Sequence, residues 1–192
     1  GSDFIAIANT YITELIAHDR AGEPVTSYAR IYESFFMSFY DSTMSLYRNQ
    51  YAMFGDPEVL PVKVIWDYTY YWGVLCQLFF QGRLTDLTTL SRLQDELGGS
   101  KALNFVMQDF LREWSARSRR TNRSVLLDQA RLEWFAELNR GLRDPLDTEA
   151  FKARIRLTTG QLRQLAREIV ATATAQHPGL DAGPVLALLD GP

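Results

Sequence analysis

The sequence has few of the residues that hold metals or covalent crosslinks. Its 192 residues include one cysteine, Cys76, and two histidines, His18 and His177. A single cysteine forms no internal disulfide, and two separated histidines give no metal-ligand spacing, so we expect neither a disulfide framework nor a metal site. Both histidines fall near predicted helix ends and are expected to be exposed. Cys76, among leucines, is expected to be a small core hydrophobe.

An excess of positive charge is also lacking. Lys and Arg number 20 against 23 Asp and Glu, which gives a formal net charge of −3. The main electrostatic signature of nucleic-acid binding is therefore missing, and no nucleic-acid partner is expected. The arginine-rich stretch 112–123 fits either a phosphate-binding patch or a solvated helix end, and the negative overall charge favours the helix end.

Targeting segments are not recognised either. No basic segment precedes the first apolar residues, so we expect no signal peptide and a cytoplasmic location. Residues 61–81 are long enough to span a bilayer, but Lys63, Asp67 and Gln77 interrupt them. One Asp near a helix centre costs about 2.5–3.5 kcal/mol on insertion. We therefore expect a buried helix of a soluble domain and no membrane partner.

The chain does have helical periodicity. Apolar residues recur at helical spacing, without strictly alternating runs bounded by turn residues, and this predicts an all-α bundle of about seven helices. The predicted helices span residues 3–21, 27–54, 61–82, 86–97, 101–119, 124–140 and 147–176, followed by an apolar tail at 185–189. Gly98-Gly99 is expected to end the fourth helix, Ser100 to cap the fifth and Asp147 the seventh. The Thr-Thr-Gly stretch 158–160 is the candidate position for a kink or a break in the seventh helix.

Aromatic residues are concentrated in one part of the chain. Of 24 aromatic residues, 16 lie between Tyr28 and Phe80, including eight of the nine tyrosines. One interpretation is an aromatic core between helices 27–54 and 61–82, which would place these two helices at the centre of the fold with Trp66 or Trp72 among the most buried side chains. The other interpretation is that these residues line a wet cavity or an interface, because each buried tyrosine hydroxyl needs a hydrogen-bond partner.

Two carboxylates lie within this aromatic region. Asp67 follows Lys63 by four residues, so the two can pair on one helix face, and Arg48 follows Asp41 by seven residues on the face of the predicted helix 27–54. These groups fit either a general acid or base at the floor of a pocket or buried ion pairs between two helices. Since no histidine, cysteine or second carboxylate converges on them, we favour ion pairs. No catalytic residue is assigned.

The N-terminal segment carries a more specific signal. Residues 1–10 place Gly1, Ser2 and Asp3 at the start of an apolar helix, whose free backbone N–H groups can bind an anion or a dipolar oxygen. This segment resembles the flavin-contacting helix of FAD-dependent halogenases and related monooxygenases of the p-hydroxybenzoate hydroxylase fold.

The resemblance extends through several further segments and covers residues 1–82. It includes Phe39-Tyr40-Asp41-Ser42, residues 47–55, residues 63–68 and Trp72-Gly73-Val74-Leu75, which look like the helical C-terminal region of the tryptophan-halogenase-like branch.

The resemblance implies a role for particular residues. FAD would be the cofactor, and backbone N–H groups of Gly1, Ser2 and Asp3 would stabilise negative charge at the flavin N1–C2=O edge. Trp66 and Tyr70 would border an aromatic or hydrophobic small-molecule substrate.

Several motifs of the family would lie upstream of this region, and none is recognised in the chain: the Gly-x-Gly-x-x-Gly turn, a second flavin-contacting Gly-Asp motif, Trp-x-Trp-x-x-Pro and the catalytic lysine. We therefore interpret the chain, which begins without Met, as part of a larger α/β flavoprotein whose upstream FAD-binding domain is its partner. Residues 1–24 would form a flavin-edge helix. Residues 25–192 would form a helical domain, aromatic-rich over 25–82 and more polar over 83–192. The chain alone is expected to be inactive and to bind FAD weakly.

Two alternatives stay open. Halogenation, hydroxylation and another flavin-dependent oxidation are equally compatible with the resemblance. The aromatic region also fits a non-catalytic helical module that binds a hydrophobic ligand or a partner helix in a groove.

Overall fold

The computed structural model describes residues 1–120 and 128–191, and this part of the chain is helical with no β-strand. The predicted all-α class is confirmed. The α-helices are α1 (Ser2–Arg20), α2 (Val25–Met44), α3 (Leu60–Tyr70), α4 (Gln77–Phe80), α5 (Leu87–Arg92), α6 (Gln94–Arg117), α7 (Glu133–Arg140), α8 (Thr148–Gln176) and α9 (Gly183–Asp190). Shorter helical turns are η1 (Tyr51–Met53), η2 (Tyr71–Cys76), η3 (Gln129–Arg131) and η4 (Gly141–Arg143).

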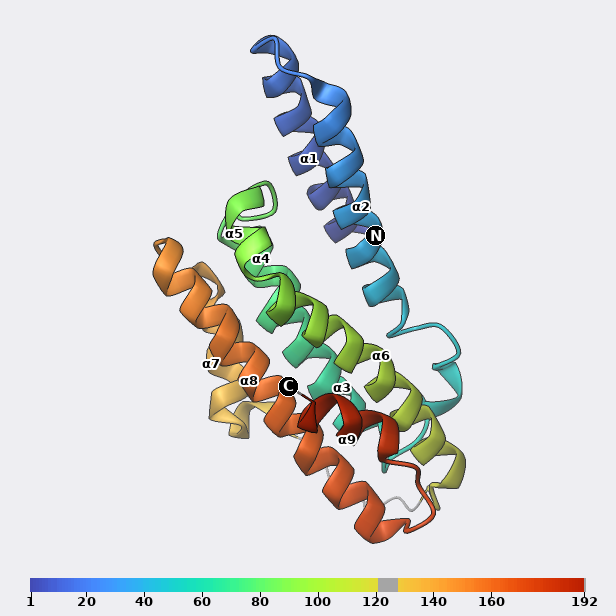
Figure 1. The fold of residues 1–192 in the computed structure, drawn as a ribbon. Coiled ribbons are helices and arrows are strands. Elements are labelled where there is room, and N and C mark those ends of the chain that lie inside the picture. Colours follow the sequence, from blue (N-terminus) through green and yellow to red (C-terminus); the bar gives the residue numbers. More distant parts are fainter. Residues whose placement is uncertain (121–127, 192) are drawn as a thin grey trace.

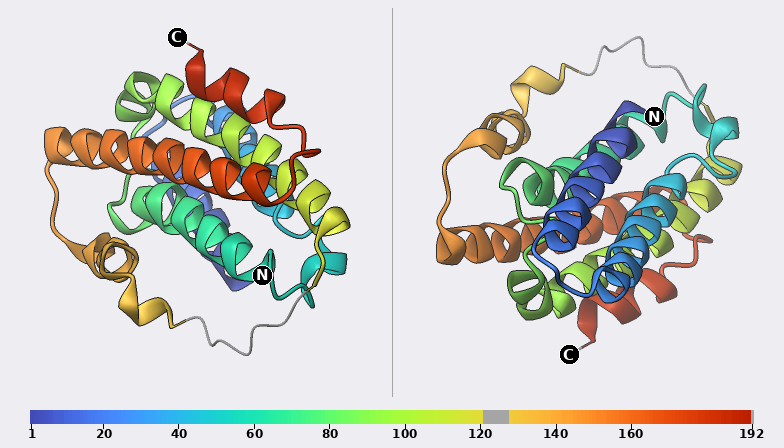
Figure 2. Two further views of the ribbon diagram at one scale, coloured as in Figure 1. Left: turned by 90° about the horizontal axis from the view of Figure 1, so that it is seen from below. Right: turned by 90° about the horizontal axis from the view of Figure 1, so that it is seen from above.

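The helices form a bundle with an antiparallel pair attached (Figure 1). α3, α6 and α8 pack together, and α9 lies against α6 and α8. α1 and α2 lie side by side and extend past the bundle. Both views in Figure 2 place α7 and α9 on opposite sides of α8. No helix within the described ranges is both long and apolar enough to cross a membrane.

The first hydrophobic core lies where α3, α6, α8 and α9 meet. Trp66 of α3 is fully buried here, as are Met107 and Leu111 of α6. Ala173 of α8 and Val185 of α9 complete the contact between the helices. Trp66 or Trp72 was predicted to be among the most buried side chains, and this is confirmed for Trp66.

The second core joins the α1–α2 pair to the bundle. It combines Ile7 of α1, Tyr32 of α2 and Leu78 of α4 with Phe151 and Ile155 of α8. Of the residues of α2, only Tyr32 and Ser42 are buried. The prediction that the second helix lies at the centre of the fold is therefore wrong, because it packs on one side only.

A π-helical turn interrupts the central helix. Residues 60–80 continue without a break from α3 through η2 to α4, close to the predicted helix 61–82, but η2 is π-helical. At Gly73 within it, α8 comes so near that an added Cβ would lie 3.3 Å from Thr158 Cβ. The Thr158 hydroxyl donates to the Gly73 carbonyl at 2.8 Å. Single π-turns inside α-helices occur frequently at functional sites.

The starts of α5 and α8, which are capped by Asp side chains, agree closely with the starts predicted from the sequence. Asp86 accepts the Thr89 N–H at 3.0 Å at the start of α5, and Asp147 accepts the Ala150 N–H at 2.8 Å at the start of α8. α8 then runs to residue 176 without ending at the predicted kink.

Two predicted helix ends are wrong. α6 passes through Gly98 and Gly99, and Ser100 lies inside it, because the break occurs earlier at the fully buried Leu93. α2 ends at Met44 instead of residue 54. There, the Ser45 hydroxyl donates to the Ser42 carbonyl at 2.7 Å, a local bond that competes with the helix. The start of the predicted helix 124–140 lies partly outside the described residues.

Candidate functional site

The first turn of α1 borders a cavity of about 470 Å³, here called the aromatic pocket. Its walls come from α1, η2, α4, and the α7–η4 segment. Its residues are Asp3, Ala6, Ile7, Tyr71, Trp72, Leu75, Cys76, Phe79, Phe80, Asn139, Arg140, Leu142 and Arg143. A volume of this size is typical of small-molecule sites.

Asp3 connects the start of α1 to the pocket wall. The Tyr71 hydroxyl donates to its carboxylate at 2.6 Å. No side chain in the described ranges caps the N-terminus of α1, although Ser2 and Asp3 were available to do so. The first backbone N–H groups of this helix are consequently left without a side-chain acceptor.

An aromatic stripe forms the floor of the pocket. Trp72, Leu75, Cys76 and Phe79 follow one another at i, i+3, i+4 and i+7, the spacing of one helix face. Trp72 packs on Phe135 of α7 with ring centroids 4.9 Å apart. These residues were not assigned to the site from the sequence, but their spacing was the signal that would have identified them.

Two arginines belong to the wall formed by α7 and η4. Gln81 fastens η4 to the end of α4 by donating to the carbonyls of Leu142 at 3.0 Å and Asp144 at 2.8 Å. The Arg143 guanidinium lies 5.9 Å from the centre of the Phe80 ring. Arg140 also lines the pocket. The proximity of these residues to α1 depends on tertiary packing and gave no signal in the sequence.

Burial keeps two side chains of the pocket, Tyr71 and Cys76, protonated. Burial, together with the hydrogen bond to Asp3, raises the pKa of the Tyr71 hydroxyl well above its usual range. Burial likewise raises the pKa of the Cys76 thiol to about 12. Because the thiolate is the reactive form, Cys76 acts as the buried apolar residue predicted from the sequence, not as a nucleophile. The part of the pocket wall formed by Tyr71 and Cys76 is therefore uncharged.

The two residues expected at the substrate wall lie elsewhere. Trp66 is 0% exposed, and its Nε1 donates to Asn104 Oδ1 at 3.1 Å. Tyr70 is buried, is hydrogen-bonded to Ser42, and lines a different cavity. Of the sequence-assigned site residues, only Asp3 lines the aromatic pocket.

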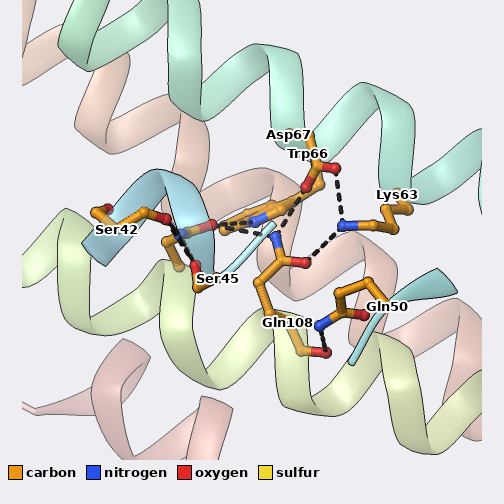
Figure 3. Close-up of polar contacts among 8 residues, drawn as sticks. Ser42, Ser45, Gln50, Lys63, Trp66, Asp67 and Gln108 are labelled. Atoms are coloured by element: carbon orange, nitrogen blue, oxygen red, sulfur yellow. Dashed lines mark hydrogen bonds and ion pairs between the residues drawn. The ribbon is translucent and has the colours of Figure 1, made fainter. Parts of the chain in front are cut away.

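Trp66 instead belongs to a buried polar network (Figure 3). Lys63 pairs with Asp67 at 2.8 Å, and Gln108 of α6 binds both side chains, at 2.7 and 2.8 Å. Burial lowers the pKa of Lys63 and raises that of Asp67, while each charge partly offsets the shift of the other. Asn104 extends the network by donating to Ser45 Oγ at 3.0 Å.

The Lys63–Asp67 pair predicted from the sequence is confirmed. The expected connection between helices 27–54 and 61–82 is wrong for this pair, because both partners lie on α3 and their hydrogen bonds reach Gln108 of α6. The predicted placement of Asp41 and Arg48 on one helix face is wrong, because α2 ends before Arg48. Asp41 itself is exposed.

The prediction that both histidines are exposed is also wrong. The His18 ring stacks on Tyr28 at 3.7 Å between centroids and pairs with Glu23 at 2.6 Å. His177 Nε2 lies 2.6 Å from Glu58 Oε1, and 11% of its side chain is exposed. A carboxylate distant in the sequence binds His177, and this contact gave no sequence signal.

Arginines after residue 111 behave as a solvated helix end. Arg112 pairs with Asp109 at 2.6 Å and Arg117 with Glu113 at 2.7 Å, in both cases within one turn of α6. Arg123 lies outside the described residues.

A second cavity of about 370 Å³ lies between α2, the central helix, α5 and α6, and is here called the α2–α6 pocket. Its lining is mostly apolar and includes Tyr70. Lys101 is the one charged residue that lines it within the described part of the chain.

No family model, curated protein or solved structure matches this chain.

Proposed function

We propose that this chain is the helical portion of a cytoplasmic FAD-dependent, halogenase-like oxidoreductase or monooxygenase that acts on an aromatic or hydrophobic substrate. The observation that carries the proposal is that the first turn of α1 and the aromatic stripe of η2 and α4 border one pocket. The aromatic pocket would form part of the substrate wall, and the start of α1 would lie along one edge of the flavin site. The FAD-binding domain upstream in the same protein would be the partner.

The start of α1 suits an electron-rich flavin edge. Its uncapped N–H groups, at Gly1, Ser2 and Asp3, favour nearby negative charge, and the Asp3 carboxylate is held by Tyr71. FAD, when bound, supplies the redox chemistry. The part of this chain would be to stabilise negative charge at that edge and to exclude water with Trp72 and Phe79.

Substrate binding is tested by filling the aromatic pocket. Ala6 lines it from α1, whereas Ala17 lies on an exposed face of the same helix. Calorimetric titration with 2-naphthol, a neutral bicyclic aromatic probe, should give one-to-one binding to the wild-type chain. Ala6→Phe should weaken binding about tenfold or more, and Ala17→Phe should leave it unchanged. Equal affinities for all three proteins would contradict a substrate role of this pocket.

The flavin-dependent part of the proposal is tested by the coding sequence directly before Gly1. A strand and helix joined by Gly-x-Gly-x-x-Gly in that sequence would support it, because this turn brings the backbone close to the cofactor pyrophosphate. A start codon directly before Gly1 would contradict it.

A non-catalytic binding module is the second candidate. It is favoured by one observation, the exposure of Ile5, Ile12 and Ile16 on α1 at 64%, 51% and 50%. A start codon before Gly1 combined with 2-naphthol binding would select this alternative.

A further inference from the structure

We propose that the α2–α6 pocket binds a single-chain aliphatic carboxylate, with its tail between α2, α5 and α6 and its carboxylate on Lys101. This site is separate from the aromatic pocket and does not depend on the function proposed above. At about 30 Å³ for each heavy atom, the volume of about 370 Å³ suits a chain of about eight to ten carbons.

The walls of the pocket suit an aliphatic tail. They are built by elements far apart in the sequence, and they are predominantly apolar. The apolar side chains include Ile31, Phe35, Phe39, Val74, Leu90 and Leu97. A mixed aliphatic and aromatic lining with few polar groups is typical of sites for hydrophobic ligands.

Lys101 gives the pocket a single positive charge. Its Nζ donates to Ser38 Oγ at 2.8 Å, a neutral acceptor from α2. Within residues 1–120 and 128–191, no carboxylate lies within 4.0 Å of it. An ammonium has three donors, so Lys101 can bind a ligand carboxylate while it keeps the bond to Ser38. A charge-assisted bond of this kind would place the ligand head group at the α6 side of the pocket.

Gly98 keeps the pocket open. It lies inside α6 and lines the pocket, and a Cβ added to it would have no atom within 4 Å. Glycine is disfavoured in a helix interior, so Gly98 leaves this space open at a cost in helix propensity. Gly99 also has open space around it but does not line the pocket, which makes it a matched control.

The test compares octanoate with 1-octanol by calorimetric titration of the 192-residue chain. The wild-type chain should bind octanoate one-to-one, and 1-octanol about tenfold more weakly, because the alcohol lacks the charge. Lys101→Met should remove this preference. Gly98→Phe should abolish binding of both ligands, and Gly99→Phe should bind them as the wild type does.

Each result decides the proposal. Absence of saturable octanoate binding to the wild-type chain would overturn it, as would equal affinity for the two ligands or equal effects of Gly98→Phe and Gly99→Phe. Far-UV circular dichroism verifies that each variant is folded. Any variant that loses its helical signal is replaced by Lys101→Gln, Gly98→Leu or Gly99→Leu, for which the same results are expected.

Discussion

Trp66 combines a large apolar ring with one satisfied polar group. The ring is 0% exposed, and Nε1 donates to Asn104 at 3.1 Å. Replacing it with alanine removes the ring from the first core and leaves Asn104 without this donor. We therefore expect Trp66→Ala to lower the free energy of unfolding by about 3–5 kcal/mol, measured by urea denaturation. Trp72→Ala should cost clearly less, because Trp72 is only partly buried and lines a cavity. Equal losses would contradict this ranking.

Glu58 is held by three donors from distant parts of the chain. His177, Ser118 and Trp114 contact its carboxylate at 2.6, 2.9 and 3.1 Å. Burial raises the pKa of Glu58, but these hydrogen bonds outweigh it, and the pKa lies below its usual value. The resulting stability is present above the unfolded-state pKa and is lost as pH falls through the lower, folded-state pKa.

The pH dependence of this contact is testable with Glu58→Gln. At pH 7 the variant should lose about 1–3 kcal/mol of unfolding free energy, because hydrogen bonds to a charged acceptor are lost. The difference from wild type should shrink as pH falls through the lowered pKa of Glu58, because both side chains are neutral below it. Glu137→Gln is the control, since its pair with Arg140 is long, at 3.9 Å, and largely exposed. A difference that stays constant from pH 7 down to the acid unfolding of the protein would argue against the ionised Glu58 contact.

At the scale of helices, three glycines inside the helical segments are expected to behave differently. Gly98→Ala and Gly99→Ala add a Cβ in open space and should each raise the stability by about 0.5–1 kcal/mol. Gly73→Ala should lower it by about 1–3 kcal/mol, because the new Cβ would lie 3.3 Å from Thr158 Cβ on α8. Thermal unfolding measures all three. A stabilising Gly73→Ala would mean that α8 adjusts easily at η2.

Sequence reasoning located helix ends that local chemistry determines. Asp86 and Asp147 cap helices through their own neighbours, and such contacts are visible in a short segment of sequence. The break at Leu93 and the passage of α6 through two glycines were missed, because burial of Leu93 in the second core depends on distant helices.

Only the α1 side of the candidate site could be predicted from the sequence. Asp3 lies at the start of an apolar helix, and this position was the reason for assigning it to a binding site. The spacing of the aromatic stripe from Trp72 to Phe79 was visible in the sequence. That spacing alone does not distinguish residues that line a pocket from residues of the hydrophobic core. Arg143 reaches the same pocket through the bonds of Gln81 to η4, which no local pattern encodes.

At the scale of the whole molecule, one helical segment lines both the aromatic pocket and the α2–α6 pocket. The continuous segment 60–80 faces the aromatic pocket with Trp72 and Cys76, and the α2–α6 pocket with Tyr70 and Val74. A π-helical turn changes the angular spacing of side chains where these two faces diverge. The two proposed ligand sites are thus separated by the width of a single helix.

The 192-residue chain is expected to bind FAD weakly on its own. In the fold that the sequence resembles, most cofactor contacts come from an upstream glycine-rich turn, whereas here the α1 N-terminus is the proposed flavin contact. A helix terminus contributes about 0.3–1 kcal/mol when exposed and up to about 2 kcal/mol when partly buried. Micromolar affinity requires about 8 kcal/mol. A flavin-fluorescence titration should therefore show no saturation at low micromolar concentration. One-to-one saturation in that range would mean that the aromatic pocket supplies most of the binding energy, and would assign the flavin chemistry to this chain itself.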